Sequence, residues 1–394
     1  MPMTMTLDNR GSALVAEMKD VVLAEAGRAE ADRTMTPGIV EALWDTGLMR
    51  YMNPAAAGGD EPGFAEMLRT WREMAFLDGS FGWIGIANLP SAAAVAAYLP
   101  EQGFNEVFGD LSSRVTLGGQ FAPNGQGLVV DGGYQVTGSW NFGSGTGHSE
   151  WVCAGFLPID DGNFVFDPDG QIQLLAGVFH RDEITFTDGW HVQGLKGTGS
   201  YDYNLADTFI PGHRVFNLFA RSPYRGDSPV FRMGLMAITA GGHAAWALGV
   251  AESMLHDVSE LALAKTRMGD METLAHKASF QRGYAHHLGM WRAANLLVLD
   301  TFTAAEASVA AGEELTPTMR ADMRVAATYA TEASREVAQW AHLAAGTTAI
   351  REGSRLERAF RDLYTGTQHA FISEKTYLDS AQVLLGLVDD QRGL

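Results

Sequence analysis

The hydrophobic pattern of this chain changes its period twice, and that change limits the folds available to it. Residues 1–117 and 229–394 carry apolar side chains at the three- and four-residue spacing of amphipathic helices. Between them, 18 of the 45 glycines fall between Gly118 and Gly199, and residues 134–142 alternate apolar with polar side chains, as a half-buried strand does. Helices on both sides of a strand-rich middle predict an α+β fold.

The same patterns divide the 394 residues into three parts, an N-terminal helical domain over 1–117, a central β domain over 118–228 and a C-terminal helical bundle over 229–394. Asp131-Gly132 predicts a hairpin, and several short strands with regular turns predict a small barrel or sandwich. Four long helical pieces with short links predict an antiparallel four-helix bundle. The expected helices span 12–33, 39–46, 63–77, 81–99 (with Pro90 as a boundary or kink), 233–268, 271–311, 318–344 and 361–387, and the further strands span 151–157, 172–179, 183–186 and 201–209.

Charge and cysteine content narrow the class of protein. Asp plus Glu number 47 against 28 Lys plus Arg, a net charge of −19, which argues against nucleic acid or a membrane surface as partner. The single cysteine, Cys153, allows no intrachain disulfide and no zinc site of several thiolates. The N-terminus lacks the basic and apolar regions of a signal peptide, and the apolar stretch 235–251 is expected to be a core helix rather than a membrane span. We expect a cytoplasmic protein.

Motifs of the common nucleotide and zinc sites are absent. No GxGxxG opens a helix after a strand, and neither GxxxxGK[ST] nor HExxH occurs. No acidic or histidine residue on the same stretch of sequence completes a metal site with His276, His286 and His287, so we interpret them as surface or core histidines. We therefore expect no metal, and no nicotinamide site with which the chain could reduce a cofactor itself.

The segment from Trp140 to Gly145 is the most informative part of the chain. A strand delivers a large aromatic residue and then a hydroxyl, Ser144, between two glycines. The tryptophan could pack against a flat ring, and Ser144 or a backbone amide could bond a ring nitrogen. A core tryptophan followed by a loose turn would have the same sequence, and both interpretations stay open at this point.

Four segments together resemble the acyl-CoA dehydrogenase superfamily, and within it the flavin-dependent monooxygenase branch that includes the oxygenase components of hydroxyphenylacetate hydroxylase and dibenzothiophene monooxygenase. Residues 138–151 resemble the flavin-facing segment of that branch. The segments occur in the family's order and cover nearly the whole chain, and the order of helices, β domain and helices, obtained from periodicity, agrees with an acyl-CoA dehydrogenase-like fold. The other three segments are 78–83, an N-terminal helical motif, 190–200, the end of the β domain, and 358–369, a C-terminal motif.

One position in the C-terminal motif favours the monooxygenase branch. Acyl-CoA dehydrogenases abstract a proton with a carboxylate, often a glutamate shortly after an Arg-Asp pair, whereas here Arg361-Asp362 is followed by His369 and Ala370. Alanine accepts no proton, and imidazole is a poor base for a weak carbon acid. The resemblance therefore implies the oxygenase component of a two-component monooxygenase. An FAD-dependent desaturase, or an N- or S-oxygenase on the same scaffold, is the alternative.

The resemblance also implies cofactors and partners. A separate NAD(P)H:flavin reductase would supply FMNH2 or FADH2 by diffusion, and O2 would form a C4a-hydroperoxide that must be sheltered from water. The distal oxygen would pass to an aromatic or polycyclic small molecule. Because family members form tetramers, we expect a homotetramer.

Residue roles follow from the same resemblance. His369 is expected to stabilise oxygen transfer or to act as a base, since the pKa of histidine lies near working pH. Ser144 matches a hydroxyl beside the flavin N5 edge. Asn88 stands where some members carry a histidine facing the substrate, with helix-end capping before Pro90 as the alternative. The expected cofactor contacts are Trp140 on the isoalloxazine ring, Asn141, Phe142 and Ser144 beside it, Lys196, Thr198 and Ser200 at the cofactor mouth, Arg267 on a flavin phosphate, and Gly346 and Thr347 toward a neighbouring subunit's flavin.

Overall fold

The computed structural model describes residues 9–394, so the first eight residues lie outside the described part. The described chain begins with helices. The Asp78 carboxylate begins α4 because it accepts the N–H groups of Ser80 and Phe81, which have no partner inside the helix. Asn9 begins the first helix in the same way. The N-terminal helices are α1 (Arg10–Asp32), α2 (Pro37–Thr46), α3 (Phe64–Leu77), α4 (Gly79–Tyr98) and α5 (Glu101–Phe108).

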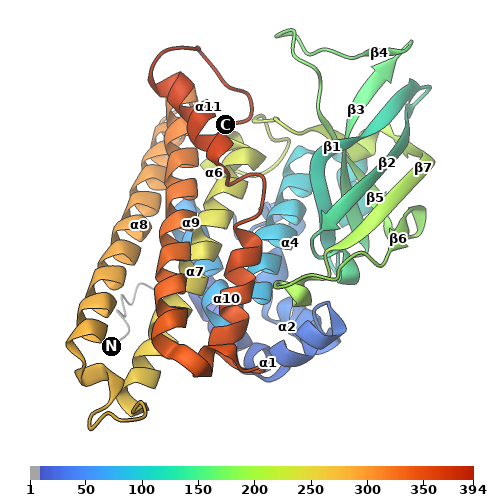
Figure 1. Ribbon diagram of the computed structural model, residues 1–394. Helices are drawn as coiled ribbons and strands as arrows, with labels where there is room; N and C mark the ends of the chain where they lie inside the picture. The colour runs from blue at the N-terminus through green and yellow to red at the C-terminus, as the bar shows by residue number, and fades with distance from the viewer. Residues whose placement is uncertain (1–8) are drawn as a thin grey trace.

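The middle of the chain forms one mixed sheet of eight strands (Figure 1). Its hydrogen-bonded order is β6-β7-β2-β1-β3-β5-β8, with β4 paired to β3. β1 and β2 form the hairpin expected at Asp131-Gly132, whereas β1 and β3 run parallel. A separate hydrophobic core around Trp140, Phe156 and Tyr203 holds the sheet together. The strands are β1 (Leu117–Val130), β2 (Gly133–Gly143), β3 (Trp151–Asp160), β4 (Asn163–Phe164), β5 (Leu175–His180), β6 (Thr185–Thr187), β7 (Tyr201–Pro211) and β8 (Val215–Asn217).

Long helices form the rest of the chain and pack side by side (Figure 1). α7 packs on α9 and on α3, and α8 packs on α9, so the N-terminal and C-terminal helices share one hydrophobic core. The stretch 235–251 lies in α7 and is almost wholly buried, which confirms the expected core helix. These helices are α6 (Pro229–Met233), α7 (Leu235–Ala264), α8 (Ala278–Ala310), α9 (Pro317–Ala345), α10 (Arg355–Gly366) and α11 (Glu374–Leu384).

α4 is the central helix of this core. Among the described residues it is the one helix long and apolar enough, by length and composition, to cross a bilayer. Of the apolar 18-residue stretch that meets this test, 94% is buried inside the protein. A core helix passes the same test, so this finding is weak evidence for a membrane span.

The structure confirms the fold class and the helix expected over 81–99, and it corrects one expected helix. α4 runs through Pro90, which is therefore no boundary, since packing on nearly every side holds the turn that lacks a backbone donor. The single helix expected over 361–387 is broken, because residues 367–373 form a turn between α10 and α11. His369 therefore lies in a connection rather than on a helix.

Candidate functional site

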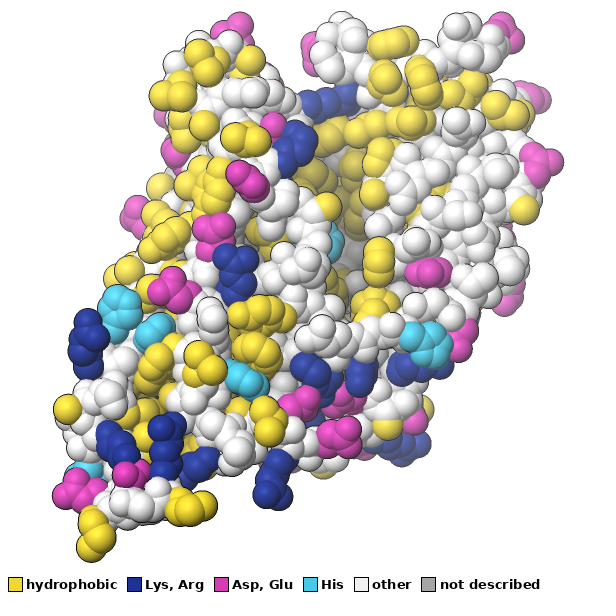
Figure 2. All heavy atoms as spheres, viewed as in Figure 1, with side chains coloured by type: hydrophobic (Ala, Val, Ile, Leu, Met, Phe, Trp, Pro, Cys, Tyr) yellow, Lys and Arg dark blue, Asp and Glu magenta, His cyan; other side chains and the backbone are white. Residues whose placement is uncertain are grey.

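A deep cleft separates the β domain from the C-terminal helices (Figure 2). Apolar side chains line much of it, a histidine is visible in its depth, and basic side chains gather near one end. The glycine turn after β2 and the α10–α11 connection come from the two parts that this cleft separates, and both contact Trp83 of α4. We therefore take the cleft as the candidate active site.

Trp83, from α4, joins two of the expected site residues. Its indole Nε1 donates to Ser144 Oγ over 2.9 Å, and its ring lies edge-on to that of His369 with centroids 5.9 Å apart. Ser200 Oγ also donates to Ser144 Oγ, over 3.1 Å. Since Ser144 accepts two hydrogen bonds, its own proton remains free to donate to another group. The structure thus gathers Ser144, Ser200 and His369 around one indole.

The expected role of Trp140 is wrong, and the core interpretation left open by the sequence is confirmed. The indole is fully buried and stacks on Tyr203, with ring centroids 5.4 Å apart. Its Nε1 donates to the carbonyls of Ala122 and Gly155. A ring enclosed in this way belongs to the core of the β domain and cannot pack against a cofactor in the cleft.

Phe142 presents the aromatic surface that we expected from Trp140. The register of β2 against β7 shifts between Trp140 and Gly143, and Phe142 adopts a φ of +63°. A bulge of this kind redirects a side chain, and Phe142 is 61% exposed, edge-on to Trp190 with centroids 6.2 Å apart. Asn141, also expected at the cofactor, is exposed on the same bulge.

Asn88 lies too deep to contact a substrate, which corrects its expected catalytic role. Its side chain is fully buried, and Nδ2 donates to the carbonyl of Leu117 and, over 3.3 Å, to Ser149 Oγ. Its amide also lies against Gly145, where an added β-carbon would be 2.2 Å from Nδ2. Asn88 is therefore a positioning residue that fixes the glycine turn next to Ser144, and because α4 continues past it, it caps no helix end.

The structure makes His369 a neutral hydrogen-bond donor. Its Nδ1 accepts the N–H of Phe371 over 3.2 Å, so the proton of the neutral ring sits on Nε2. The protein around the ring and the charge of Arg324 lower the pKa of His369 to about 4, while the side chain keeps access to solvent. This pKa lies below the expected value near working pH, and in this tautomer the Nδ1 lone pair is already occupied by the Phe371 N–H.

A second imidazole, His243 of α7, lies behind His369. The ring centroids are 4.5 Å apart, and His243 Nδ1 donates to the carbonyl of Thr239 over 2.9 Å. Burial and the neighbouring His369 hold the pKa of His243 well below its usual value, so this ring is neutral as well. Sequence reasoning assigned no role to His243 or Trp83, because one histidine in an apolar helix forms no motif and Trp83 occurred only as part of a family segment.

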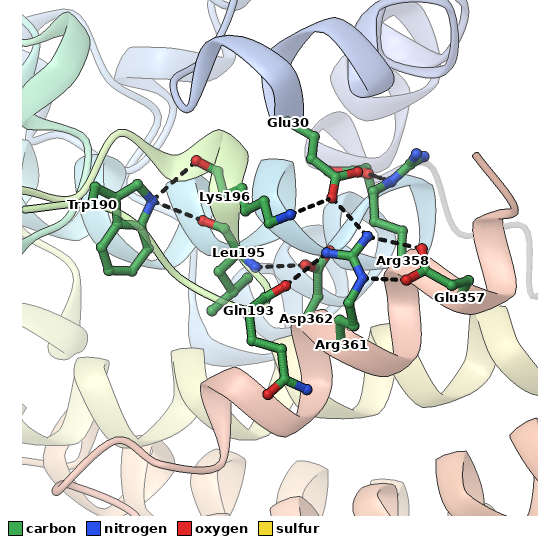
Figure 3. A network of polar contacts seen from close by, with 10 residues as sticks. Glu30, Trp190, Gln193, Leu195, Lys196, Glu357, Arg358, Arg361 and Asp362 are labelled. Carbon is green, nitrogen blue, oxygen red and sulfur yellow. Dashed lines mark hydrogen bonds and ion pairs between the residues drawn. The ribbon is translucent and has the colours of Figure 1, made fainter. Parts of the chain in front are cut away.

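Polar contacts anchor the segment 190–200 to α10 and α1 (Figure 3). Lys196 Nζ lies 3.6 Å from Glu30 Oε1 of α1. Thr198 is fully buried and its hydroxyl donates to the carbonyl of Leu195 over 2.8 Å, which corrects its expected cofactor contact. The expected contact of Lys196 stays a prediction, and Ser200 reaches Ser144.

Asp362 is the main anchor of this segment. Its Oδ1 accepts the N–H of Leu195 over 2.6 Å, while Oδ2 has no partner among the described residues. Burial and the nearby Asp78 carboxylate raise the pKa of Asp362, so the folded protein favours the neutral carboxyl group. A neutral acceptor of the same shape should therefore serve equally well.

We expect Asp362→Asn to unfold at nearly the wild-type urea concentration at pH 7, since its amide oxygen can still accept the Leu195 N–H. Asp362→Ala should lose about 1–3 kcal/mol, because a buried donor is left without a partner. The folded state holds a proton that the unfolded state releases above about pH 4. The free energy of unfolding of the wild type should thus fall as pH rises through the raised pKa. The asparagine variant should lack this pH dependence, because its amide does not titrate. Equal losses in both variants would contradict this account.

Arg267 and Gly346 lie together, but far from the other site residues. Arg267 Nη2 donates to the carbonyl of Ala344 over 2.9 Å, beside the turn that contains Gly346 and Thr347. This turn closes the end of α7 that is remote from His243, about 33 Å away along the helix at 1.5 Å per residue. Within one chain these residues therefore do not contribute to the cleft.

The donor set around the cleft fits a flavin. The exposed ring of Phe142 offers a surface for a flat aromatic system, and the free proton of Ser144 and the Nε2–H of His369 face the same region beside Trp83. A flavin is a flat aromatic ring with polar atoms at its edge, so its site needs both an apolar surface and hydrogen-bonding groups. Among the described residues, three clustered ligand side chains elsewhere (His286, His287 and Glu336) lie on the surface of α8 and α9, outside the cleft.

Comparisons with known proteins find flavin-dependent monooxygenases among the proteins similar to this chain. A family model described as acyl-CoA dehydrogenase, C-terminal domain, matches residues 241–374. The chain is 27% identical to indole-3-acetate monooxygenase from Acinetobacter baumannii, over 95% of this chain and 93% of that protein. It is 29% identical to the flavin-dependent monooxygenase oxygenase subunit HsaA from Mycobacterium tuberculosis, over 91% of this chain and 89% of that protein.

Solved structures show the same architecture. The crystal structure of HsaA from M. tuberculosis superposes with a TM-score of 0.88 at 26% identity, covering 98% of this chain and 100% of that one. XiaF from Streptomyces in complex with FADH2 and glycerol superposes with a TM-score of 0.83 at 24% identity, covering 96% and 97%. The chain thus has an acyl-CoA dehydrogenase-like fold, and over nearly its whole length it is similar to the oxygenase components of flavin-dependent monooxygenases.

Proposed function

We propose that this chain hydroxylates an aromatic or polycyclic small molecule with O2 and a reduced flavin, FMNH2 or FADH2. The observation that carries the proposal is that two neutral donors, Ser144 Oγ–H and His369 Nε2–H, lie beside the same indole, that of Trp83. The relative named indole-3-acetate monooxygenase supports an aromatic substrate.

Reduced flavin, when bound, would supply the electrons that activate O2. The side chains that would hold it are Phe142 through its exposed ring and Ser144 and Ser200 through their hydroxyls. Trp83, Trp246 and His243 are buried and pack edge-on or tilted against one another, so water is excluded behind the His369 imidazole. A dry floor with fixed donors stabilises developing negative charge on oxygen more than water can.

The alternative of a desaturase lacks its base in this site. Asp362, the carboxylate of the Arg-Asp pair on α10, is 1% exposed and faces Leu195. His369 is a donor in its present tautomer, so neither group can abstract a proton from a substrate in the cleft. Oxygenation at nitrogen or sulfur differs only in the substrate, and product analysis would distinguish it from ring hydroxylation.

We further propose that the active form is a cytoplasmic homotetramer in which Arg267, Gly346 and Thr347 approach a neighbour's flavin. Their distance from the cleft of their own chain supports this assignment. Light scattering should give a mass about four times that of the 42.5 kDa chain. A monomer would end this part of the proposal without affecting the chemistry of the cleft.

The decisive test is turnover with isotopic oxygen. Purified protein, a generic flavin reductase, NADH and ¹⁸O2 should convert at least one member of a panel of phenols and indoles to a hydroxylated product that carries ¹⁸O. Label entering from water, or no product from any panel member, would overturn the proposal. Anaerobic bleaching of tightly bound FAD by an acyl thioester would instead establish the desaturase.

A further inference from the structure

A cavity open to solvent lies between α6, α7, α9 and the segment after β8. Its walls are mostly leucine, methionine, phenylalanine and alanine side chains, as in Met233, Leu235 and Met323. Three arginines also line it, and no aspartate or glutamate does, although the chain as a whole carries a net charge of −19. The cavity is therefore a local positive region with apolar walls. The arginines are Arg221, Arg320 and Arg324.

Two of these guanidinium groups are buried with donors left over. Arg324 is 7% exposed, and its Nη2 donates to the carbonyl of Phe371 over 2.8 Å, but Nε and Nη1 have no partner among the described residues. Arg320 is 5% exposed, and its Nη2 pairs with Asp390, but Nε is again without a partner. Buried N–H groups without acceptors cost free energy, so the cavity is prepared for an acceptor that is not part of the chain.

The carboxylates nearest to these arginines do not supply that acceptor. Asp390 is more than half exposed and bonds Arg320 from outside the cavity. Asp379 and Glu314 act on Arg324 and Arg221 only through their charges and form no ion pair with them. Arg221 itself donates only a long bond, 3.5 Å, to the carbonyl of Leu315.

The cavity is connected to the reactive end of the cleft by a short chain of contacts. The Arg324 guanidinium lies 3.4 Å from the centroid of the Phe371 ring. Phe371 in turn lies 5.7 Å from His243 between centroids, and its N–H bonds His369. A substrate whose ring lies beside His369 could therefore extend past Phe371 and place its far end at Arg324.

We propose that this arginine-lined cavity binds the carboxylate of an aromatic or polycyclic acid, so that the substrate of this chain is an anion with an apolar body. A carboxylate would accept the free N–H groups of Arg324 and Arg320, and a planar guanidinium suits two-oxygen recognition. The inference rests on the proposed hydroxylation and adds to it the chemical class of the substrate.

The test measures binding without catalysis. Three acids and their neutral amides serve as probes: phenylacetate and phenylacetamide, indole-3-acetate and indole-3-acetamide, 2-naphthoate and 2-naphthamide. Isothermal titration of the full chain, without flavin, should show at least one acid bound about tenfold more tightly than its amide, a difference of about 1.4 kcal/mol. Arg324→Met and, separately, Arg221→Met should reduce that preference toward one.

If Arg324→Met does not fold, Arg221→Met still tests the inference, because the Arg221 side chain donates only the long bond to the Leu315 carbonyl. Arg335→Met is the matched control, since Arg335 lies on the exposed face of the same helix as Arg324. No preference for any acid, or a preference unchanged by both cavity variants, overturns the inference. A loss of FMN or FAD affinity without a loss of acid preference assigns the arginines to a flavin phosphate and overturns it as well. Because the readout needs no O2, a failure of hydroxylation alone leaves the result intact.

Discussion

Replacing His369 by phenylalanine should lower the yield of oxygenated product per NADH by about 100-fold, the usual cost of removing one fixed donor to developing negative charge. The ring and its packing against Trp83 and His243 are kept, but the Nε2–H is lost. NADH should still be consumed, with its electrons recovered as hydrogen peroxide. Reduced-flavin affinity should stay close to that of the wild type, and His276→Phe, at an exposed site, should change nothing.

The pH dependence gives an independent check on His369. Desolvation by the surrounding protein and the charge of Arg324 lower the pKa of its imidazole to about 4, so the ring stays neutral at and above neutral pH. In that range the product yield should not change with pH because of this group. The yield should fall only as the pH drops toward that pKa and the ring gains a proton. A limb near the ordinary histidine pKa of about 6.5 that disappears in His369→Gln would show instead that the imidazole acts as a base.

Gly145→Ala should destabilise the protein by about 2–4 kcal/mol, from positive-φ strain and overpacking together. Gly145 has a φ of +76°, and its new β-carbon would lie 2.2 Å from Asn88 Nδ2. Asn88 cannot retreat, since it is buried and bonded to Leu117 and Ser149. The displaced turn carries Ser144, so product yield should fall together with the midpoint of urea unfolding.

Gly132 offers a matched control for this substitution. Its φ is +79°, but nothing lies within 4 Å of an added β-carbon, so Gly132→Ala should cost only the backbone strain of about 1 kcal/mol. In an Asn88→Ala background the cost of Gly145→Ala should shrink to this level, because the atoms it would meet are gone. An equal cost in both backgrounds would show that Asn88 does not fix the turn.

The architecture could be predicted from the sequence because each part has a strong period. Helical spacing on both sides of an alternating, glycine-rich middle sufficed for the order of the three regions, and the Asp131-Gly132 hairpin followed from turn chemistry alone. The break around His369 could not be predicted, since residues 367–373 contain neither proline nor glycine. Tertiary contacts make that break, as Arg324 holds the carbonyl of Phe371 while His369 holds its N–H.

The candidate site was predicted only in part. Ser144 and His369 came from a family resemblance, and the structure places both beside Trp83. The alternation of apolar and polar residues along the strand is consistent with the inward-facing Trp140. It could not predict that a bulge turns Phe142 outward, because a bulge depends on the pairing of two distant strands. Of the cavity arginines, Arg221 lies far in sequence from Arg320 and Arg324 and joins them only when α9 meets the segment after β8.

The seven-residue connection between α10 and α11 separates the reactive imidazole from the rigid scaffold. Asp362 fixes the helix before the connection, and Arg324 fixes the end that follows His369. Insertions, deletions or substitutions between these two anchors can therefore move the imidazole without disturbing the helical core. A laboratory that wishes to adapt this scaffold to new molecules should diversify this short connection first and leave both anchors untouched.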